Sequence, residues 1–292
     1  MIRALLLCLL LTACARPELG AMPDPILYEK PKGPAHSVVI GIPGALTSIR
    51  VLEPIEAFRG KDRGTAYYRL PGYDDLPART PFSINIAAGQ VATFVRDQGF
   101  EEVFLVGHST GAAIAMETAK VLHDIRPDID VHIAGISTAL PAPQPLLSGL
   151  RNATGTVAAA LRARSLRPRT VWIEQYRRIS YGPDASHHAE VIAKANALVR
   201  ERGEQIQLPS RGLGLKHFWA ILGWQNNRPE RLDAVDTVFW HGGVDPVFRA
   251  AAVERFAGKM SQSKVHVLDH HGHIILLTYP EIWSEMADHW GF

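Results

Sequence analysis

Cysteine is scarce in this 292-residue sequence, which has two, Cys8 and Cys14, both within the first fourteen residues. The residues beyond Cys14 contain no disulfide among themselves, so we expect the fold to rely on its apolar core, which a chain of this length can supply. Long apolar runs are scarce too. The run 4–11, preceded by Arg3, has eight residues, far fewer than the roughly 20 that span a bilayer. Its form is typical of a targeting signal.

Several functional signatures are also absent. The sequence has no Gly-x-x-x-x-Gly-Lys phosphate loop, no His-Glu-x-x-His zinc motif and no interleaved pattern of basic and aromatic residues. It has no evident internal repeat. The formal net charge is +2, with 47% hydrophobic and 21% charged residues. These features predict one globular unit and give no indication of a nucleic-acid partner.

The end of the signal is the next informative feature. Segment 11–14, Leu-Thr-Ala-Cys, resembles a bacterial lipoprotein box, in which residues 1–13 are removed and Cys14 is lipidated as the new N-terminus. Ala15 after the cysteine is typical of lipoproteins of the outer membrane. An ordinary secretory signal with an incidental cysteine is the alternative. We therefore expect an exported chain, lipid-anchored to the bacterial cell envelope at its outer membrane.

Residues 14–25 are predicted to form a tether, because they carry prolines and show no clear apolar pattern. Eleven flexible residues, 15–25, reach about 20 Å on average. A lipidated chain is anchored to a bilayer without spanning it. The folded part, with the membrane as its partner, is therefore expected to stay close to the bilayer.

The pentapeptide Gly-His-Ser-Thr-Gly at 107–111 is the most specific pattern in the sequence. It stands between the apolar run 103–106, which predicts a buried strand, and the run 112–120, which predicts a helix rich in small residues. Gly-x-Ser-x-Gly at a strand-to-helix turn is typical of a nucleophile elbow, where a strained bend exposes the serine oxygen. The pattern alone arises by chance in about one chain in ten of this length. Its context predicts Ser109 as a nucleophile.

An activated serine needs a base and a carboxylate that orients it. The predicted strand 237–240 leads into a Gly-rich turn that contains Asp245. The predicted strand 264–268 leads into the segment 269–273, Asp-His-His-Gly-His. Residues at the ends of parallel strands meet at one edge of a sheet, so both segments are candidates for the partners of Ser109.

The order serine, acid, histidine resembles the α/β-hydrolase superfamily, and specifically its serine esterases and lipases with an inserted cap. The resemblance covers the chain from about residue 34 to its end, apart from a middle segment. It implies that Ser109 is the nucleophile, Asp245 the acid and His273 the base, with no metal and no cofactor. His273 is selected by its Gly-His pair, which an apolar run and a proline follow. His270 and His271 remain possible bases.

Other interpretations of these residues stay open. Ser109 is also compatible with a catalytically dead relative. Asp245 precedes a proline and is suited to cap a helix that begins near Pro246. The four side chains Asp, His, His and His at 269, 270, 271 and 273 are of types that bind zinc, although four ligands within five residues converge poorly on one ion.

The same resemblance implies an oxyanion hole of two backbone N–H groups. One is expected from Thr110, directly after the nucleophile. The other is expected from the loop after the predicted strand 37–42, where Ala45 is the candidate and the adjoining residue is the alternative. Pro43 stands where the family often has histidine, and it has no N–H to donate.

Alternating strands and helices predict the fold class, an α/β-hydrolase fold with a mostly parallel central sheet, helices on both faces and an inserted helical cap. The expected core comprises 26–143 and 236–292, and the expected cap 144–235. A helix with Ser83 as its N-cap is predicted before the elbow. In the cap, helices are predicted at 153–166, 170–180, 185–202 and 215–225.

The expected cap is basic and aromatic. It contains fourteen Lys or Arg against seven Asp or Glu. A solvated helical surface is the ordinary explanation of this charge, and the alternative is a surface that contacts anionic head groups or attracts anionic substrates. Its tryptophans, Trp172, Trp219 and Trp224, line an acyl pocket or form the cap's own core.

These features predict a serine-dependent hydrolase that acts on a small-molecule or lipid ester at a membrane surface, through an acyl-enzyme. An acyltransferase, thioesterase or amidase would use the same residues, and a non-catalytic lipid-binding lipoprotein is the alternative from another class. Neither the natural substrate nor the oligomeric state follows from the sequence.

Overall fold

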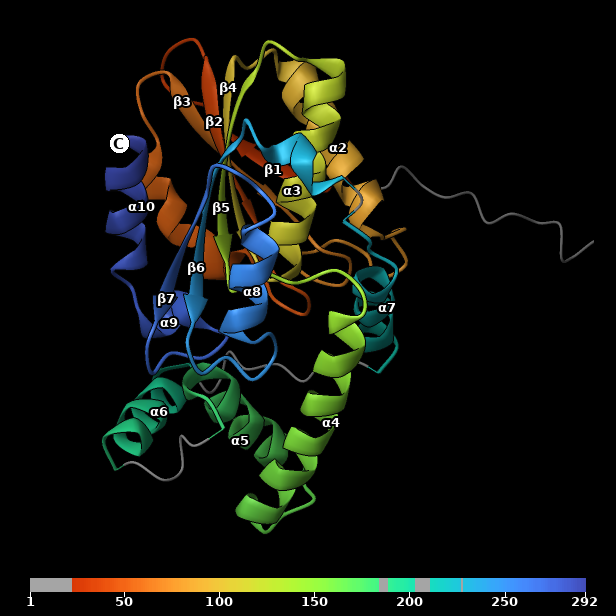
Figure 1. The fold of residues 1–292 in the computed structure, drawn as a ribbon, viewed down its shortest axis with the longest axis vertical. Coiled ribbons are helices and arrows are strands. Elements are labelled where there is room, and N and C mark those ends of the chain that lie inside the picture. The colour runs from red at the N-terminus through yellow and green to blue at the C-terminus, as the bar shows by residue number, and fades with distance from the viewer. Residues whose placement is uncertain (1–22, 184–188, 203–210, 227) are drawn as a thin grey trace, which may run out of the picture.

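Seven strands form a single sheet, in the order β1-β3-β2-β4-β5-β6-β7 (Figure 1). The structure is a computed structural model that describes residues 23–183, 189–202, 211–226 and 228–292. The strands are β1 (Ile26–Glu29), β2 (Ser37–Ile42), β3 (Arg63–Tyr68), β4 (Glu102–His108), β5 (Asp130–Ile136), β6 (Asp236–Gly242) and β7 (Ser263–Leu268). Only β1 runs antiparallel, along β3 at the edge; the other five pairings are parallel.

The central strands are apolar on both faces, because helices cover both faces of the sheet. All six residues of β2 are buried, as are the last six of β4. One face carries α2 (Ile84–Gln98), α3 (Thr110–Ile125) and α8 (Ala250–Ala257). The other carries η1 (Ile49–Phe58), α9 (Ile275–Thr278) and α10 (Ile282–Trp290), as Figure 1 shows for α10. Two apolar cores result, one on each side.

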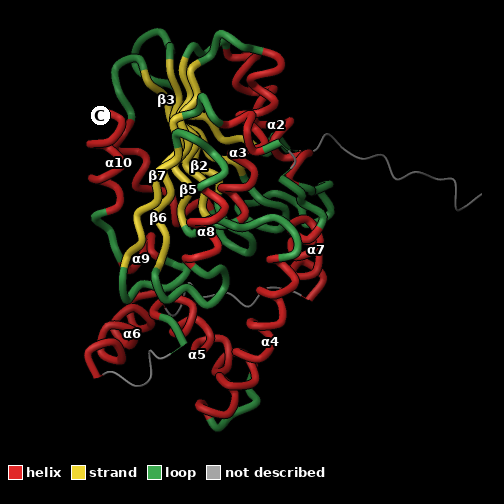
Figure 2. Tube along the Cα trace, viewed as in Figure 1, coloured by secondary structure: helices red, strands yellow, loops and turns green. Residues whose placement is uncertain are grey.

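Four further helices lie between β5 and β6, beyond the carboxyl edge of the sheet, in a region whose described residues Figure 2 draws as helix and loop. They are α4 (Gln144–Ala163), α5 (Pro168–Tyr181), α6 (Ala189–Arg202) and α7 (Arg211–Leu222), and the 3-10 turn η2 (Pro229–Leu232) follows. These elements confirm the predicted fold class, with its inserted helical region. The exact division into core and cap remains a prediction.

Several predicted helix boundaries differ from those in the structure. α4 begins at Gln144 rather than at 153. Its first turns contain Pro145, which a helix tolerates at its start, and Gly149, a poor helix former, and these residues hid the helix from a prediction based on propensity. α8 begins at Ala250, not near Pro246. The strand β1 and the helix η1 were not predicted. The expected start of α6 at 185 falls outside the described residues. None of the described helices is long and apolar enough to cross a membrane.

Candidate active site

The predicted nucleophile elbow lies where β4 ends and α3 begins. Ser109 has φ 51° and ψ −113°, a strained conformation for a residue with a side chain. Its N–H donates to the Ile136 carbonyl at 2.8 Å. The flanking glycines allow the close approach, because a Cβ on Gly107 would lie 2.5 Å from the Ala112 Cα and one on Gly111 would lie 1.9 Å from the Ile42 oxygen. The bend turns the serine side chain toward the carboxyl edge of the sheet.

A continuous hydrogen-bonded chain joins the three residues predicted to form the triad. His273 Nε2 lies 3.0 Å from Ser109 Oγ, and His273 Nδ1 lies 2.7 Å from Asp245 Oδ2. All three side chains are buried. Of the three histidines considered as the base, the structure brings His273 to the serine. His271 instead pairs with Thr278, its Nδ1 2.9 Å from the hydroxyl oxygen.

Asp245 is oriented by the turn in which it stands. Its Oδ1 accepts from the N–H groups of Val247, at 2.6 Å, and Phe248, at 3.1 Å. His241 Nε2, which donates to the Phe248 carbonyl at 2.8 Å, lies 3.2 Å from the other oxygen, Oδ2. Burial by itself raises the pKa of Asp245, but the charge and hydrogen bond of His273, with His241 and the Val247 N–H, hold that pKa below its usual value. Asp245 thus stays ionised beside the imidazole, and it does not cap α8, which begins at Ala250.

The loop that carries His273 is attached to the end of α5. The N–H groups of Gly272 and His273 donate to the carbonyls of Ser180, at 2.8 Å, and Ile179, at 2.5 Å. These carbonyls belong to the last turn of α5, where a helix offers them no N–H partner of its own. A Cβ on Gly272 would lie 2.3 Å from the Ile179 oxygen, so the approach requires glycine. The inserted region therefore holds the loop of His273 in place.

His108, in the elbow, supports the same loop from beneath. Its Nε2 donates to the His273 carbonyl at 3.3 Å, and the two imidazole rings lie 5.4 Å apart. Burial lowers the pKa of His108 to about 3, with a further contribution from His273, so the ring stays neutral. A Cβ on Gly44 would lie 2.6 Å from His108 Nδ1. His108 thus also limits which residue the loop after β2 can carry.

The two residues predicted to supply the oxyanion hole come from separate segments, Ala45 from the loop after β2 and Thr110 from the start of α3. Thr110 is the first residue of α3, so its N–H has no acceptor within the helix. Ala45 lies in the loop after β2, directly before Leu46, which has φ 62°. The Leu46 N–H donates to His217 Nδ1 at 3.1 Å. Leu46 is therefore not available as an oxyanion donor, which favours Ala45 over the alternative that follows it.

His217 is a residue of the site that no sequence pattern indicated. It belongs to α7, is almost fully buried, and its Nε2 donates to the Pro71 carbonyl at 3.1 Å. Burial lowers its pKa, in keeping with a neutral ring that accepts at Nδ1 and donates at Nε2. On the other side of the loop, Asp74 accepts from the Ser48 hydroxyl and, at 2.9 Å, from the Ile49 N–H. Side chains from segments distant in sequence thus hold the loop after β2 that contains Ala45 and Leu46, which we call the oxyanion loop.

The zinc alternative for residues 269–273 finds no support in their geometry, since His271 pairs with Thr278 and His273 with Asp245. Within the described ranges, one group has ligand atoms within 4.8 Å of one another, Glu102, Asp130 and His132. It lies where β4 and β5 begin, at the sheet edge opposite Ser109.

The remaining predicted residues are distributed as follows. Cys14, the predicted lipidation site, lies outside the described residues. Trp224 belongs to the apolar core on the sheet face that carries α2, α3 and α8, and its Nε1 donates to the Glu117 carboxylate at 2.9 Å. Trp219, by contrast, is exposed on α7. Neither tryptophan therefore forms a core of the cap itself.

The comparisons with known proteins agree with the fold. Among solved structures, the chain is similar to BpoC of Mycobacterium tuberculosis H37Rv (14% identity, 91% of this chain and 95% of that one, TM-score 0.69). It is also similar to a structure from a study of carboxylesterases of Nitrososphaera gargenis (14% identity, 92% of this chain and 95% of that one, TM-score 0.66). A third similar structure is a thermophilic esterase from Thermogutta terrifontis (17% identity, 91% of this chain and 92% of that one, TM-score 0.60). These likenesses establish the fold. Among curated proteins, no sequence matches significantly. The family model described as "Alpha/beta hydrolase family" matches residues 39–285, and the chain therefore belongs to this family.

Proposed function

We propose that this protein hydrolyses carboxylic esters through an acyl-enzyme formed on Ser109. The observation that carries the proposal is the hydrogen-bonded chain from Ser109 Oγ through His273 to Asp245, with contacts of 3.0 and 2.7 Å. The strained backbone of Ser109 adds support, because such strain is characteristic of nucleophile elbows. Two of the similar solved structures come from work on esterases or carboxylesterases.

In the proposed reaction, His273 Nε2 takes the hydroxyl proton as Ser109 Oγ attacks the ester carbonyl carbon. Asp245 stabilises the resulting imidazolium, and the N–H groups of Ala45 and Thr110 stabilise the oxyanion. His273 then gives the proton to the leaving alcohol oxygen. In the second half, His273 takes a proton from water, the hydroxide oxygen attacks the acyl carbon, and Ser109 is released with its proton restored. Neither half consumes an oxidant, a reductant or a co-substrate other than water.

Labelling with a fluorophosphonate tests the nucleophile and the base. We expect the wild-type protein to be labelled, Ser109→Ala and His273→Ala to lose labelling and ester turnover by at least about a thousandfold, and His271→Ala to retain both. His271 is the matched control because it lies two residues from His273 but pairs with Thr278. Ester turnover retained by folded Ser109→Ala would overturn the proposal. Competing alcohol, thiol and water in a product assay identify the acyl acceptor, for which we propose water.

We also propose that the protein works at a membrane surface, anchored through Cys14 at the bacterial outer membrane. The support is the lipoprotein-like segment 11–14 and the short stretch between it and β1. Metabolic labelling with a fatty acid, followed by membrane fractionation, tests the anchor. The label and the membrane association are both expected to be lost in Cys14→Ser, and an unlabelled wild-type protein would contradict this part of the proposal.

A further inference from the structure

Helix α4 has its apolar side chains on the face that points away from the protein. Leu150, Val157 and Leu161 are 66%, 62% and 73% exposed. With Leu146 and Leu147, which are also exposed, they lie within roughly 100° of arc at 3.6 residues per turn. A solvated surface helix normally presents polar residues on that face. The outward face of α4 is therefore suited to an apolar environment.

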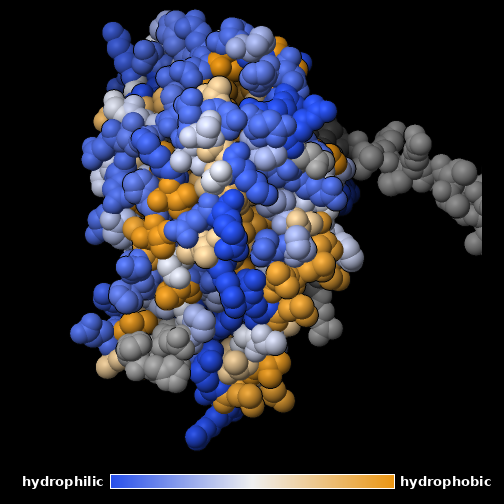
Figure 3. Space-filling view, viewed as in Figure 1, coloured by the Kyte–Doolittle hydropathy of each residue, from blue (hydrophilic) through white to orange (hydrophobic). Residues whose placement is uncertain are grey.

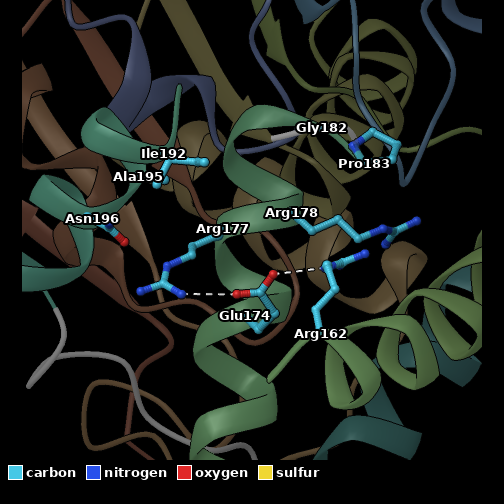
Figure 4. A pocket seen from close by; sticks show the side chains of 9 residues that line it. All are labelled: Arg162, Glu174, Arg177, Arg178, Gly182, Pro183, Ile192, Ala195 and Asn196. Carbon is cyan, nitrogen blue, oxygen red and sulfur yellow. Dashed lines mark hydrogen bonds and ion pairs between the residues drawn. The ribbon is translucent and has the colours of Figure 1, made fainter. Parts of the chain in front are cut away.

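The charged residues of α4 pair with groups of the protein instead, and its exposed polar residues Thr154 and Thr156 are uncharged. Its two charged residues are Arg151 and Arg162. Arg151 donates to the Val247 carbonyl at 2.8 Å, and Arg162 donates to the Glu174 carboxylate of α5 at 2.9 Å, as Figure 4 shows for the second pair. Asn152 also faces α5, where its side-chain oxygen accepts from Gln175 at 3.4 Å. The outward face of α4 consequently carries no charge.

Helix α7 continues this apolar surface. Trp219 and Leu215, one helical turn apart, are 63% and 59% exposed. α7 packs beside the first half of α4, where a Cβ on Gly149 would lie 3.2 Å from the Phe218 ring. Figure 3 shows hydrophobic side chains over α7 and along α4 on the same side of the molecule. We call the outward residues of α4 and α7 the cap face; its members are Leu146, Leu147, Leu150, Val157, Leu161, Leu215 and Trp219.

Arginines surround the free end of α4. Arg164, Arg167 and Arg169 are exposed, and Leu166 among them is 89% exposed. No acidic residue occurs between Gln144 and Arg169. Leucines beside arginines suit a bilayer surface, where the apolar side chains enter the acyl region and the guanidinium groups stay with lipid phosphates. The charge of this end is complementary to anionic lipid.

The start of the described chain lies on the α7 side of the fold. Ile26 pairs with Tyr68, the last residue of β3, so the chain enters the sheet at its carboxyl edge. Arg69, the first residue after β3, donates its N–H to the Pro25 carbonyl at 2.7 Å. The loop that follows reaches α7, since a Cβ on Gly72 would lie 2.7 Å from Leu213. An anchor eleven residues before Pro25 would thus hold the cap face within reach of a bilayer.

We propose that the cap face docks on an anionic lipid bilayer, with the α4 leucines and Trp219 inserted among the acyl chains and the arginines at 164, 167 and 169 at the phosphates. The position of the tether rests on the proposed anchoring at Cys14, whereas the apolar face and its charge do not. Docking would present the carboxyl edge of the sheet, where Ser109 lies, to the membrane side of the molecule. Ester groups of lipids are the substrates that this orientation favours.

The test uses the full chain with Cys14→Ser, so that no lipid anchor contributes, and vesicles of phosphatidylcholine with or without phosphatidylglycerol. The signal segment is the same in every variant, so differences between variants report on the cap face. Brominated acyl chains quench tryptophans that enter the bilayer, and Trp219→Phe separates the Trp219 signal from the other five tryptophans. We expect vesicles to quench Trp219, and more strongly with phosphatidylglycerol present.

Paired variants show whether the cap face causes the binding. Leu150→Glu/Val157→Glu should weaken vesicle affinity at least about tenfold, because two inserted apolar side chains are lost. Ile86→Glu/Ile125→Glu is the matched control, since these exposed residues lie on α2 and α3, and its affinity should stay within about twofold of the parent. Arg164→Gln/Arg167→Gln should weaken binding to the anionic vesicles alone. Thermal melting confirms that each variant folds.

Three results would overturn the proposal. The first is no quenching of Trp219 by the vesicles, and the second is equal vesicle affinities of the two glutamate double variants. The third is a dimer of the parent chain that Leu150→Glu/Val157→Glu dissociates, without quenching of Trp219, which would mean that a second copy of the chain covers the cap face. Ester turnover is measured in the same chain, with Ser109→Ala as the inactive control, so that failure of the docking proposal and failure of the hydrolase proposal give different results. Vesicle binding without ester turnover in the parent chain leaves the docking proposal standing and removes the hydrolase.

Discussion

Three buried histidines around the serine differ in what their ring nitrogens contact. His273 uses both nitrogens within the triad. His108 donates to the backbone of His273, and His217 joins the oxyanion loop at Leu46 to the Pro71 carbonyl. In the proposed reaction the last two are positioning residues, because they contact the backbone of His273 and of Leu46.

We expect His217 variants to alter turnover rather than substrate binding. In His217→Asn the amide oxygen takes the place of Nδ1 and can still accept from Leu46, whereas in His217→Gln the amide nitrogen takes the place of Nε2 and can still donate to Pro71. Because a lost oxyanion donor costs about 100-fold or more in kcat, a displaced loop should cost His217→Gln about tenfold, with KM little changed. His217→Asn should retain most of kcat.

Steady-state kinetics on a soluble ester measure both constants. A purely structural role would lower the melting temperature of both variants and leave their kcat values alike. Equal kcat values for Asn and Gln would therefore contradict a role for the Leu46 contact.

At the scale of elements, the end of α5 and the loop after β7 form one unit. The last carbonyls of a helix lack partners within it, and two of those in α5 accept from Gly272 and His273. A cap that moved away as a rigid body would break both bonds and displace His273, the proposed base. The contact thus couples the inserted helices to the triad.

Replacing Gly272 tests this coupling. A Cβ there would meet the Ile179 oxygen at 2.3 Å, so Gly272→Ala should push the loop from α5, lowering kcat and destabilising the fold by about 1–3 kcal/mol. The matched control is Gly89→Ala in α2, where a Cβ would meet nothing within 4 Å and the better helix propensity of alanine should stabilise by about 0.5–1 kcal/mol. Kinetics and urea unfolding measure both, and wild-type kcat in Gly272→Ala would show that the coupling is unimportant.

At the scale of the whole molecule, buried histidines tie stability to pH. Burial lowers the pKa values of His108, to about 3, and of His217 and His241. Above the ordinary histidine value of about 6.5, these rings are neutral in both the folded and the unfolded chain. Below it the unfolded chain takes up protons that the folded chain does not, so the free energy of unfolding falls as the pH falls.

His108→Gln should make that pH dependence shallower. Each histidine that stays neutral in the fold contributes about 1.4 kcal/mol per pH unit once the unfolded chain is protonated, and glutamine can still donate to the His273 carbonyl. Urea unfolding between roughly pH 7 and 4.5 measures the slope of the free energy of unfolding against pH for both proteins. This pH range lies above the titration of Asp245, whose pKa is also lowered. Parallel curves for the two proteins would contradict the assignment to His108.

Much of the fold and of the site was predictable because the relevant signals are local. The apolar run of β4, the small residues of α3 and the glycines at 107 and 111 are all contiguous with Ser109. Each glycine removes a clash that any side chain would create at the bend. Such short-range steric requirements are written directly into neighbouring residues.

The sequence by itself determined the elbow, the order serine, acid, histidine, and the alternation of strands and helices, since each depends on neighbouring residues. Tertiary structure brought the expected histidine, His273, to Ser109. It alone decided that Leu46 donates to His217 across 171 positions and that α4 directs its leucines outward. These depend on which distant backbone and side-chain groups come together, and no periodicity along the chain encodes such long-range contacts.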